Sequence, residues 1–382
     1  MSLWPFLPLG EVMEVLEWRT DVMRARSEEM RHRLRERPRR QWHFNHELDA
    51  DGQAAARAIV RGASSYQVVD WVLAVFAGAV PAGTSVSLAM DTSGLGLVAG
   101  QSVVVWNSAL DYEVCVIESV APAALVLALV ISSRASTRVF RVDNAHAAVS
   151  VNFERPTGPK QVAQISFEST GVDLYAASSY SQYRGHDVLP MVPVAGGALQ
   201  EDFSWQIERF DNETGKLSVS QQRDLIDDRF MMRWLVVTPS EIAALRAWIA
   251  SRYGRWLAFW QSTWQNDIKV AADIGSSATT LRVFAPPGTT SLGRTAFDLE
   301  IDTPAGVFLR QVTNAAAGPT VSGRPTIDLT LASALGVAVS ASAFRRISYL
   351  RCARFDADRI ELLHRPGEGL AVSVPCIEVP VP

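Results

Sequence analysis

Cysteine and lysine are scarce in this chain of 382 residues. Only three cysteines are present, Cys115, Cys352 and Cys376, and no two of them form a CxxC pair. An odd and scattered set builds no disulfide framework and lacks the paired spacing of zinc motifs. We therefore expect three buried or half-buried thiols. Lysine occurs only three times among the 36 basic residues, so arginine carries nearly all of the positive charge.

The chain also lacks a basic excess and long hydrophobic runs. Its formal net charge is −4, whereas proteins that grip nucleic acid usually carry clustered positive charge. The longest apolar runs, Trp71–Val80 and Ala121–Ser133, are shorter than the ~18–20 residues that span a bilayer. Residues 1–10 have no positively charged leader pattern. We expect a soluble protein made inside a cell, without membrane insertion.

Catalytic and cofactor motifs are missing as well. The sequence contains no GxSxG elbow, no phosphate-binding P-loop and no HExxH metal motif. The closest histidine pair, His43 and His46, has no accompanying carboxylate cluster. Asp227 and Asp228 would point to opposite faces of a strand, and Asp356 with Asp358 fits turn chemistry better than catalysis. We expect no enzyme activity, no metal and no cofactor.

What the chain does contain is a faint internal repeat. A shift of 192 residues places Trp18 on Phe210, Trp42 on Trp234 and Gly62 on Gly254 without a gap. Repeats must be found early because they decide the fold. We predict two related units, residues 1–170 and 205–382, joined by a linker at 171–204 that is rich in Gly, Pro and Ser. The alternative is two unrelated β-rich domains with coincident tryptophans.

Each predicted unit is mainly β (α+β), with one helix. The first helix is expected from Asp51 to Arg61 with Gly62 as its stop. The second begins after Pro239, is capped by Ser240, and ends at Gly254 in the left-handed conformation. Apolar runs separated by turns predict strands elsewhere, including a small β-insert in each unit at about 83–133 and 277–333. No βαβ alternation is present, which argues against a parallel doubly wound sheet.

An arginine stripe is the first unusual surface. Five arginines alternate with other residues in one segment: Arg31, Arg33, Arg35, Arg37 and Arg39. A strand would put all five on one face, and the alternative is an exposed loop. A solvated surface and a subunit interface with an acidic neighbour are equally good interpretations, because arginine is favoured at interfaces. Nucleic-acid binding is the weakest of the three.

Tryptophan is the second unusual feature. Trp256, Trp260 and Trp264 share a parity and would line one face of a strand. Sugar-binding platforms have this pattern, but buried cores and subunit interfaces have it more often. We therefore expect a core or interface role for the following set: Trp18, Trp42, Trp234, Trp256, Trp260 and Trp264.

Several segments resemble tail proteins of long-tailed bacteriophages. Leu16–Val22 (LEWRTDV) and Leu34–Arg40 (LRERPRR) are similar to the family's opening motifs. Phe259–Asp267 resembles its strand and turn after the helix, and Tyr349–Asp358 its closing strand. The resemblance implies a virion structural protein at the tail tip, either a distal tail protein or a baseplate hub. It also implies tail-tube-like β-barrels, each flanked by one helix, that join edge to edge into a ring.

The resemblance and the repeat together predict a homotrimer with pseudo-six-fold symmetry. Such a ring would join a six-fold tail tube to a three-fold tip and leave a channel for DNA in transit. The implied partners are other copies of the chain and the tail tube, tape measure, hub or fibre proteins, with assembly in the host cytoplasm. Some tip proteins carry a four-cysteine iron–sulfur site, which Cys352 and Cys376 alone cannot build. The alternative function is a carbohydrate- or receptor-binding module of a virion.

Overall fold

The protein is mainly β. The computed structural model describes residues 2–24, 28–154, 160–170, 179–194, 201–211, 213, 215, 217–221, 226–289, 291–293 and 296–380. Two α-helices occur in these ranges, α1 (Ala50–Gly62) and α2 (Pro239–Arg252), and neither is long and apolar enough to cross a membrane. The chain divides into two compact units. The first comprises Met1–Ser179, Pro193–Leu257 and Phe355–Ile377, and the second comprises Tyr180–Val192, Ala258–Arg354 and Glu378–Pro382.

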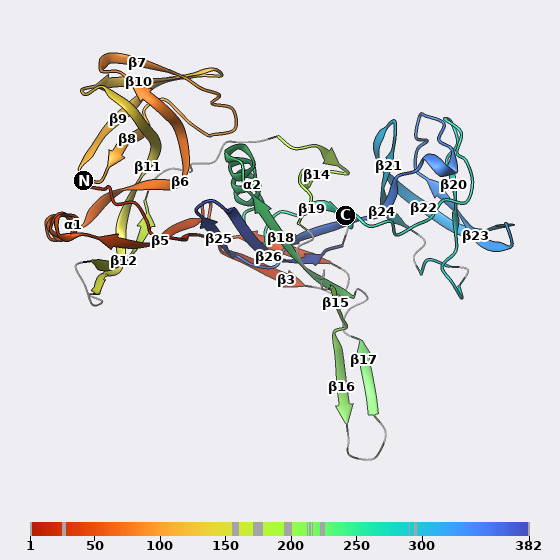
Figure 1. The fold of residues 1–382 in the computed structure, drawn as a ribbon. Coiled ribbons are helices and arrows are strands. Elements are labelled where there is room, and N and C mark those ends of the chain that lie inside the picture. Colours follow the sequence, from red (N-terminus) through yellow and green to blue (C-terminus); the bar gives the residue numbers. More distant parts are fainter. Residues whose placement is uncertain are drawn as a thin grey trace. The chain divides into compact units, whose positions relative to one another are not determined.

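The first unit is built on a long run of paired strands. Its strands are β1 (Ser2–Trp4), β2 (Val12–Glu17), β3 (Thr20–Arg24), β4 (Glu29–Arg33), β5 (Arg39–Leu48), β6 (Ser65–Val80), β7 (Gly83–Ala89), β8 (Ser102–Ser108), β9 (Asp111–Ala121), β10 (Ala124–Val130), β11 (Arg134–Glu154), β12 (Gln161–Ser169), β15 (Glu201–Ser204), β16 (Ile207–Asp211), β17 (Leu217–Gln221), β18 (Asp227–Val236), β25 (Arg359–Arg365) and β26 (Gly369–Glu378). The main ladder runs β1–β6–β11–β12–β5–β2–β25–β26–β18–β15. Figure 1 shows these strands as arrows.

Alternation of buried and open positions explains why β5 is a strand. Its sequence RRQWHFNHEL places Trp42, Phe44, His46 and Leu48 inward and polar residues outward, the period of two that a half-buried strand needs. These side chains form one hydrophobic core with β1, β6, β12 and the buried Ala56 of α1. The insert strands β7 to β10 close over a separate core. Strands β7 to β10 therefore lie within the insert that was predicted at about 83–133.

The helices confirm the predicted positions, but two of the three predicted caps are wrong. Asp49 caps α1 by accepting from the backbone of Gly52, and the helix ends with extended Ala63, so Gly62 is no left-handed stop. In α2 the cap is Thr238, which forms a reciprocal capping box with Glu241. Ser240 lies inside the helix because Pro239 occupies its first position.

The left-handed turn after α2 involves two residues. Tyr253 is the left-handed C-cap with φ 53°, and Gly254 follows it with φ 64°. A side chain at Gly254 would place its Cβ 2.6 Å from a carboxylate oxygen of Asp358. Glycine is therefore required here for both conformation and space.

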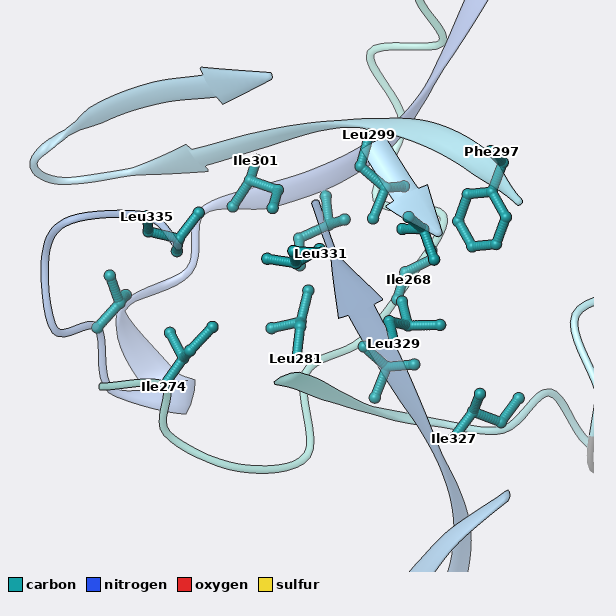
Figure 2. Close-up of a cluster of buried hydrophobic side chains, with 14 of the residues drawn as sticks. Ile268, Ile274, Leu281, Phe297, Leu299, Ile301, Ile327, Leu329, Leu331 and Leu335 are labelled. Carbon is teal, nitrogen blue, oxygen red and sulfur yellow. The ribbon is translucent and has the colours of Figure 1, made fainter. Parts of the chain in front are cut away.

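The second unit is a smaller β-structure with its own core. Its elements are β13 (Gln182–Tyr183), β14 (His186–Val188), β19 (Phe259–Ser262), β20 (Thr280–Phe284), β21 (Phe297–Thr303), β22 (Gly306–Val321), β23 (Arg324–Leu331), the 3-10 turn η1 (Ala341–Ala343) and β24 (Arg346–Phe355). Figure 2 shows its core, in which Leu281, Leu299 and Leu329 converge from three strands. About half of this unit is the predicted insert at 277–333.

The β13–β14 hairpin belongs to the second unit although it lies in the predicted linker 171–204. The Tyr183 hydroxyl donates to Asp298 at 2.7 Å, and Arg184 donates to the same carboxylate at 2.8 Å. The Trp260 indole donates to the Tyr183 carbonyl at 2.7 Å. Residues 171–178 and 195–200 of this linker lie outside the described residues.

The two halves of the chain share a set of strand pairings. In the first half β5 pairs with β12, β6 with β11, β8 with both β11 and β9, and β10 with both β9 and β7. In the second half β18 pairs with β26, β19 with β24, β21 with both β24 and β22, and β23 with both β22 and β20. All twelve pairings are antiparallel. A closed barrel is not found among the described strands, and the tandem units stay a prediction.

Candidate assembly surfaces

The arginine stripe is split between two strands and a bend. Strand β4 ends at Arg33, and β5 begins at Arg39. A single strand carrying all five arginines is therefore a wrong prediction, because the chain bends at residues 34–38, where Pro38 lacks the N–H that a ladder needs. Arg31 and Arg33 do share a face of β4, as the period of two requires.

Arg31, Arg33 and Arg35 have partners inside the chain. Arg31 pairs with Glu29 at 3.6 Å, and Arg35 pairs with Glu17 at 3.1 Å. The Arg33 guanidinium lies 4.4 Å from the ring centroid of Trp256 and 4.8 Å from that of Tyr253. This geometry is a cation–π contact. Arg37 and Arg39 are exposed. The proposed subunit-interface role of the stripe stays a prediction.

The face of the β3–β4 hairpin opposite the arginines is exposed and carries an Asp21–His32 pair beside a methionine pair. Met23 lies directly across from Met30, and their exposed fractions are 48% and 59%. Leu34, in the bend after β4, is 56% exposed. The predicted arginine surface left this methionine pair out, although the alternation within β4 separates Met30 from Arg31 and Arg33.

A second exposed surface is the hairpin of β16 and β17, here called the β16–β17 arm. Its two strands pair with each other and with no other described strand (Figure 1). Every residue of both strands is exposed, including Ile207, Phe210, Leu217 and Val219. An isolated two-stranded hairpin is marginally stable in water, so a partner surface would stabilise the arm.

The first unit also contains a groove, here called the α2 groove, with a volume of about 500 Å³. It lies between the start of α2, strand β6, the segment before β2 and the β25–β26 turn. Its wall is mostly apolar, with Trp71, Leu73 and Ile242 among the lining residues. Arg138 lines it as an exposed charged residue. A concave apolar site with few polar groups is suited to binding a hydrophobic side chain or ligand.

The predicted tryptophan face does not exist as one strand. Strand β19 covers only Phe259–Ser262, so Trp256 lies in the turn before it and Trp264 lies after it, with φ 51°. Trp260 is fully buried, as are Trp18 and Trp42. Trp234 is 3% exposed, which confirms core positions for these four.

A cluster of buried charges lies in the first unit, here called the buried ion cluster. Arg246 of α2 donates to Asp70 of β6 and to Glu14 of β2, both at 3.0 Å. Arg40 donates to Glu14 at 2.7 Å, and Arg141 donates to Asp70 at 3.2 Å. Five side chains on five elements thus form one network. Removing one partner from such a network leaves a buried charge without compensation, which destabilises the fold.

Two further groups complete the cluster. Arg40 also lies 3.5 Å from Asp143, and His364 lies 3.3 Å from Glu14. With His364 neutral, the cluster holds three guanidinium groups and three carboxyl groups. The positive and negative charges within the buried cluster therefore balance one another without a metal ion. No local pattern predicts this cluster, because its members lie up to 350 positions apart.

The pKa values in the cluster follow from burial and from the arginines. Burial would raise the pKa of Glu14, but the guanidiniums of Arg246 and Arg40 hold that pKa well below its usual value. Burial raises the pKa of Asp143 despite the opposing charge of Arg40. Burial lowers the pKa of His364, against the attraction of Glu14. A neutral His364 fits its place beside this carboxylate as a hydrogen-bond donor.

Catalytic and metal chemistry have little support in the described residues. No group of three metal-ligating side chains is found in them, and His43 and His46 lie in β5 on opposite faces. Asp358 accepts backbone N–H groups from Thr20 at 2.7 Å and Arg255 at 3.1 Å. These contacts join distant parts of the chain, so the carboxylate has a tertiary role, and its predicted turn role stays a prediction. The three cysteines are all buried and free, as expected.

Comparison with known protein families and with curated proteins finds no match for this chain.

Proposed function

We propose that the chain is a structural subunit of a ring at the tail tip of a long-tailed bacteriophage, in the position of a distal tail protein or a baseplate hub. The observation that carries this proposal is the recurrence of strand pairings along the chain. Six antiparallel pairings of the first half have counterparts, in the same order, in the second half. This shared order favours a duplicated unit over two unrelated β domains.

The helices and tryptophans support the same duplication. Strand β5 leads directly into α1, and β18 leads directly into α2. Trp42 and Trp234 are buried residues of these two strands. The two halves also differ, since β25 has no counterpart between β11 and β12. A duplicated chain with divergent halves is suited to join rings of different symmetry.

Three copies of such a chain would place six similar subdomains around one axis. A ring forms when the same heterologous contact repeats and closes. Open strand edges and apolar faces that would promote aggregation in a lone chain are covered in a ring. The exposed Met23–Met30 pair of β3–β4 and the β16–β17 arm supply such apolar surface here. The proposed partners are other copies of the chain and the tail tube, tape measure, hub or fibre proteins.

A ring that DNA crosses should not hold phosphates tightly. Each neutralised phosphate strengthens binding, and the chain has a net charge of −4 rather than a basic excess. Three arginines of the stripe are also engaged with Glu29, Glu17 and an aromatic pair. These features fit a passage for DNA rather than a DNA-binding site.

The second candidate, a carbohydrate- or receptor-binding module, loses its main support. Its sugar platform required Trp256, Trp260 and Trp264 on one accessible strand face. Trp260 is fully buried, and the three residues do not share a strand. We therefore keep the ring as the proposed function and propose no catalytic role.

Immunogold labelling of intact virions tests the location. An epitope tag after Gly323, in the exposed turn between β22 and β23, would serve as the label. The proposal expects gold at the tail tip, and a tag on the major tail tube protein gives the control pattern along the shaft. Gold on the capsid, gold along the shaft, or virions without gold would each contradict the proposal.

A further inference from the structure

We propose that the β16–β17 arm of one chain docks into the α2 groove of a second copy. This contact rests on the ring proposed above and specifies how neighbouring copies hold each other. The arm and the groove are separate surfaces of the first unit, so a contact between them is heterologous. Heterologous contacts close into rings.

One face of the arm has the chemistry that the groove requires. In the antiparallel register Ile207 lies opposite Gln221, Arg209 opposite Val219, and Asp211 opposite Leu217. Opposite residues share a face, so Ile207, Val219 and Leu217 lie on one face together with Arg209, Asp211 and Gln221. The three aliphatic side chains form a diagonal aliphatic row across that face. The other face carries Phe210 and Glu208 opposite two serines. The aliphatic row is therefore the face that we assign to the groove.

The groove has room and apolar walls for this row. Its volume is about 500 Å³, and Trp71, Leu73 and Ile242 line it. Val237, at the start of α2, lines it as well and is 59% exposed. Burial of exposed aliphatic side chains stabilises a contact by roughly 25 cal/mol for each Å² removed from water. The same burial would supply the packing that the lone hairpin lacks.

Charge complementarity favours the same pairing. The tip of the arm carries Asp211 and Glu213, both exposed. Arg138 is exposed at the groove, whereas Arg365 already contacts Glu11 and Glu368. An acidic tip meeting an exposed arginine orients the arm in the groove. Both halves of this complementarity belong to one chain, and this is why we assign the occupant as a second copy.

Disulfide trapping in the full-length chain tests the contact. One population carries Val219→Cys on the aliphatic row, and a second carries Val237→Cys in the groove. Both positions are exposed, so neither change disturbs a core, and the native cysteines are buried. Mild oxidation of the mixture is expected to give a covalent dimer joining residues 219 and 237. The matched control, Ser218→Cys on the opposite face with Val237→Cys, is expected to give about tenfold less.

A charge exchange gives a second measurement. Glu213→Arg is expected to lower the trapping yield, and adding Arg138→Glu in the groove population is expected to restore it. Native mass spectrometry of the untrapped chain is run in parallel. If a multichain ring forms but the dimer yield does not exceed that of the Ser218→Cys control, the arm contact is overturned and the ring proposal stands. A chain that stays monomeric overturns both the ring and the contact.

Discussion

The guanidinium of Arg246, on α2, donates to the carboxylate of Asp70, on β6, across 3.0 Å and 176 positions of the chain. This one contact ties a helix of the second sequence half to the sheet of the first half. Both side chains are buried, and Arg246 also holds Glu14. The first unit is therefore assembled from both ends of the chain.

Loss of Arg246 should destabilise the protein strongly. Arg246→Ala leaves the carboxylates of Glu14 and Asp70 buried with less compensating charge, and such losses cost about 3–5 kcal/mol. Arg61→Ala, on the exposed end of α1, should cost less than about 1 kcal/mol. Urea unfolding measures both. Equal costs for the two variants would show that the buried ion cluster does not hold α2 in place.

His46 should make stability pH-dependent. Burial lowers the pKa of His46 to about 4, although its hydrogen bond with the Leu7 carbonyl opposes the shift. In the unfolded chain the imidazole of this residue takes up a proton near pH 6.5. The stabilisation provided by the neutral, buried His46 is therefore fully present above pH 6.5 and is lost as the pH falls toward 4. The expected loss is about 3 kcal/mol.

His46→Gln isolates this contribution. Glutamine can still accept from the Trp4 indole and donate to the Leu7 carbonyl, but it does not titrate. The unfolding free energy of the His46→Gln variant should fall less between pH 6.5 and pH 4 than that of the native protein. His32→Gln, at an exposed position, is the control and should follow the native profile. A native-like slope in His46→Gln would rule out this origin.

Arg33 should stabilise the chain even when it is not assembled. Its contacts with Trp256 and Tyr253 lie within the first unit, and a partly exposed cation–π contact contributes about 0.5–1 kcal/mol or more. Arg33→Ala should lower the unfolding free energy by about 1 kcal/mol in dilute samples, and Arg39→Ala should leave it unchanged. If Arg33→Ala acts only on assembled samples, its role is at the subunit interface.

Trp260 should behave as a core residue. Trp260→Ala removes a fully buried indole that donates to the Tyr183 carbonyl, and such losses cost about 3–5 kcal/mol. Trp205→Ala is the matched control, since Trp205 is 55% exposed. Thermal unfolding compares the two. A folded Trp260→Ala protein that has lost glycan binding would instead support the carbohydrate-binding alternative.

Local patterns in the sequence predicted the local structure well. Pro239 and Glu241, in the first turn of α2, placed its start to within a residue. Apolar runs between turns predicted many of the strands. The tryptophan face failed because the left-handed turn at Tyr253 and Gly254 delays the next strand until Phe259. A shared parity has meaning only within one strand, and the chain leaves the extended conformation between these tryptophans.

Long-range features could not be predicted in the same way. Arg246 and Glu14 are 232 positions apart, and nothing near either residue indicates that both are buried. The exposed Met30 could have been predicted, because it alternates with Arg31 and Arg33 within β4. The arm was hidden because its two short strands have ordinary composition, and only their lack of a neighbouring described strand makes them distinctive.

The central claim is that the chain folds twice into the same kind of subdomain, so that three copies imitate a six-fold ring. Native mass spectrometry of the purified assembly tests this claim most directly by counting its chains. Three chains are expected in each closed ring. A ring of six chains would contradict it, because each chain would then contribute one ring-forming subdomain rather than two.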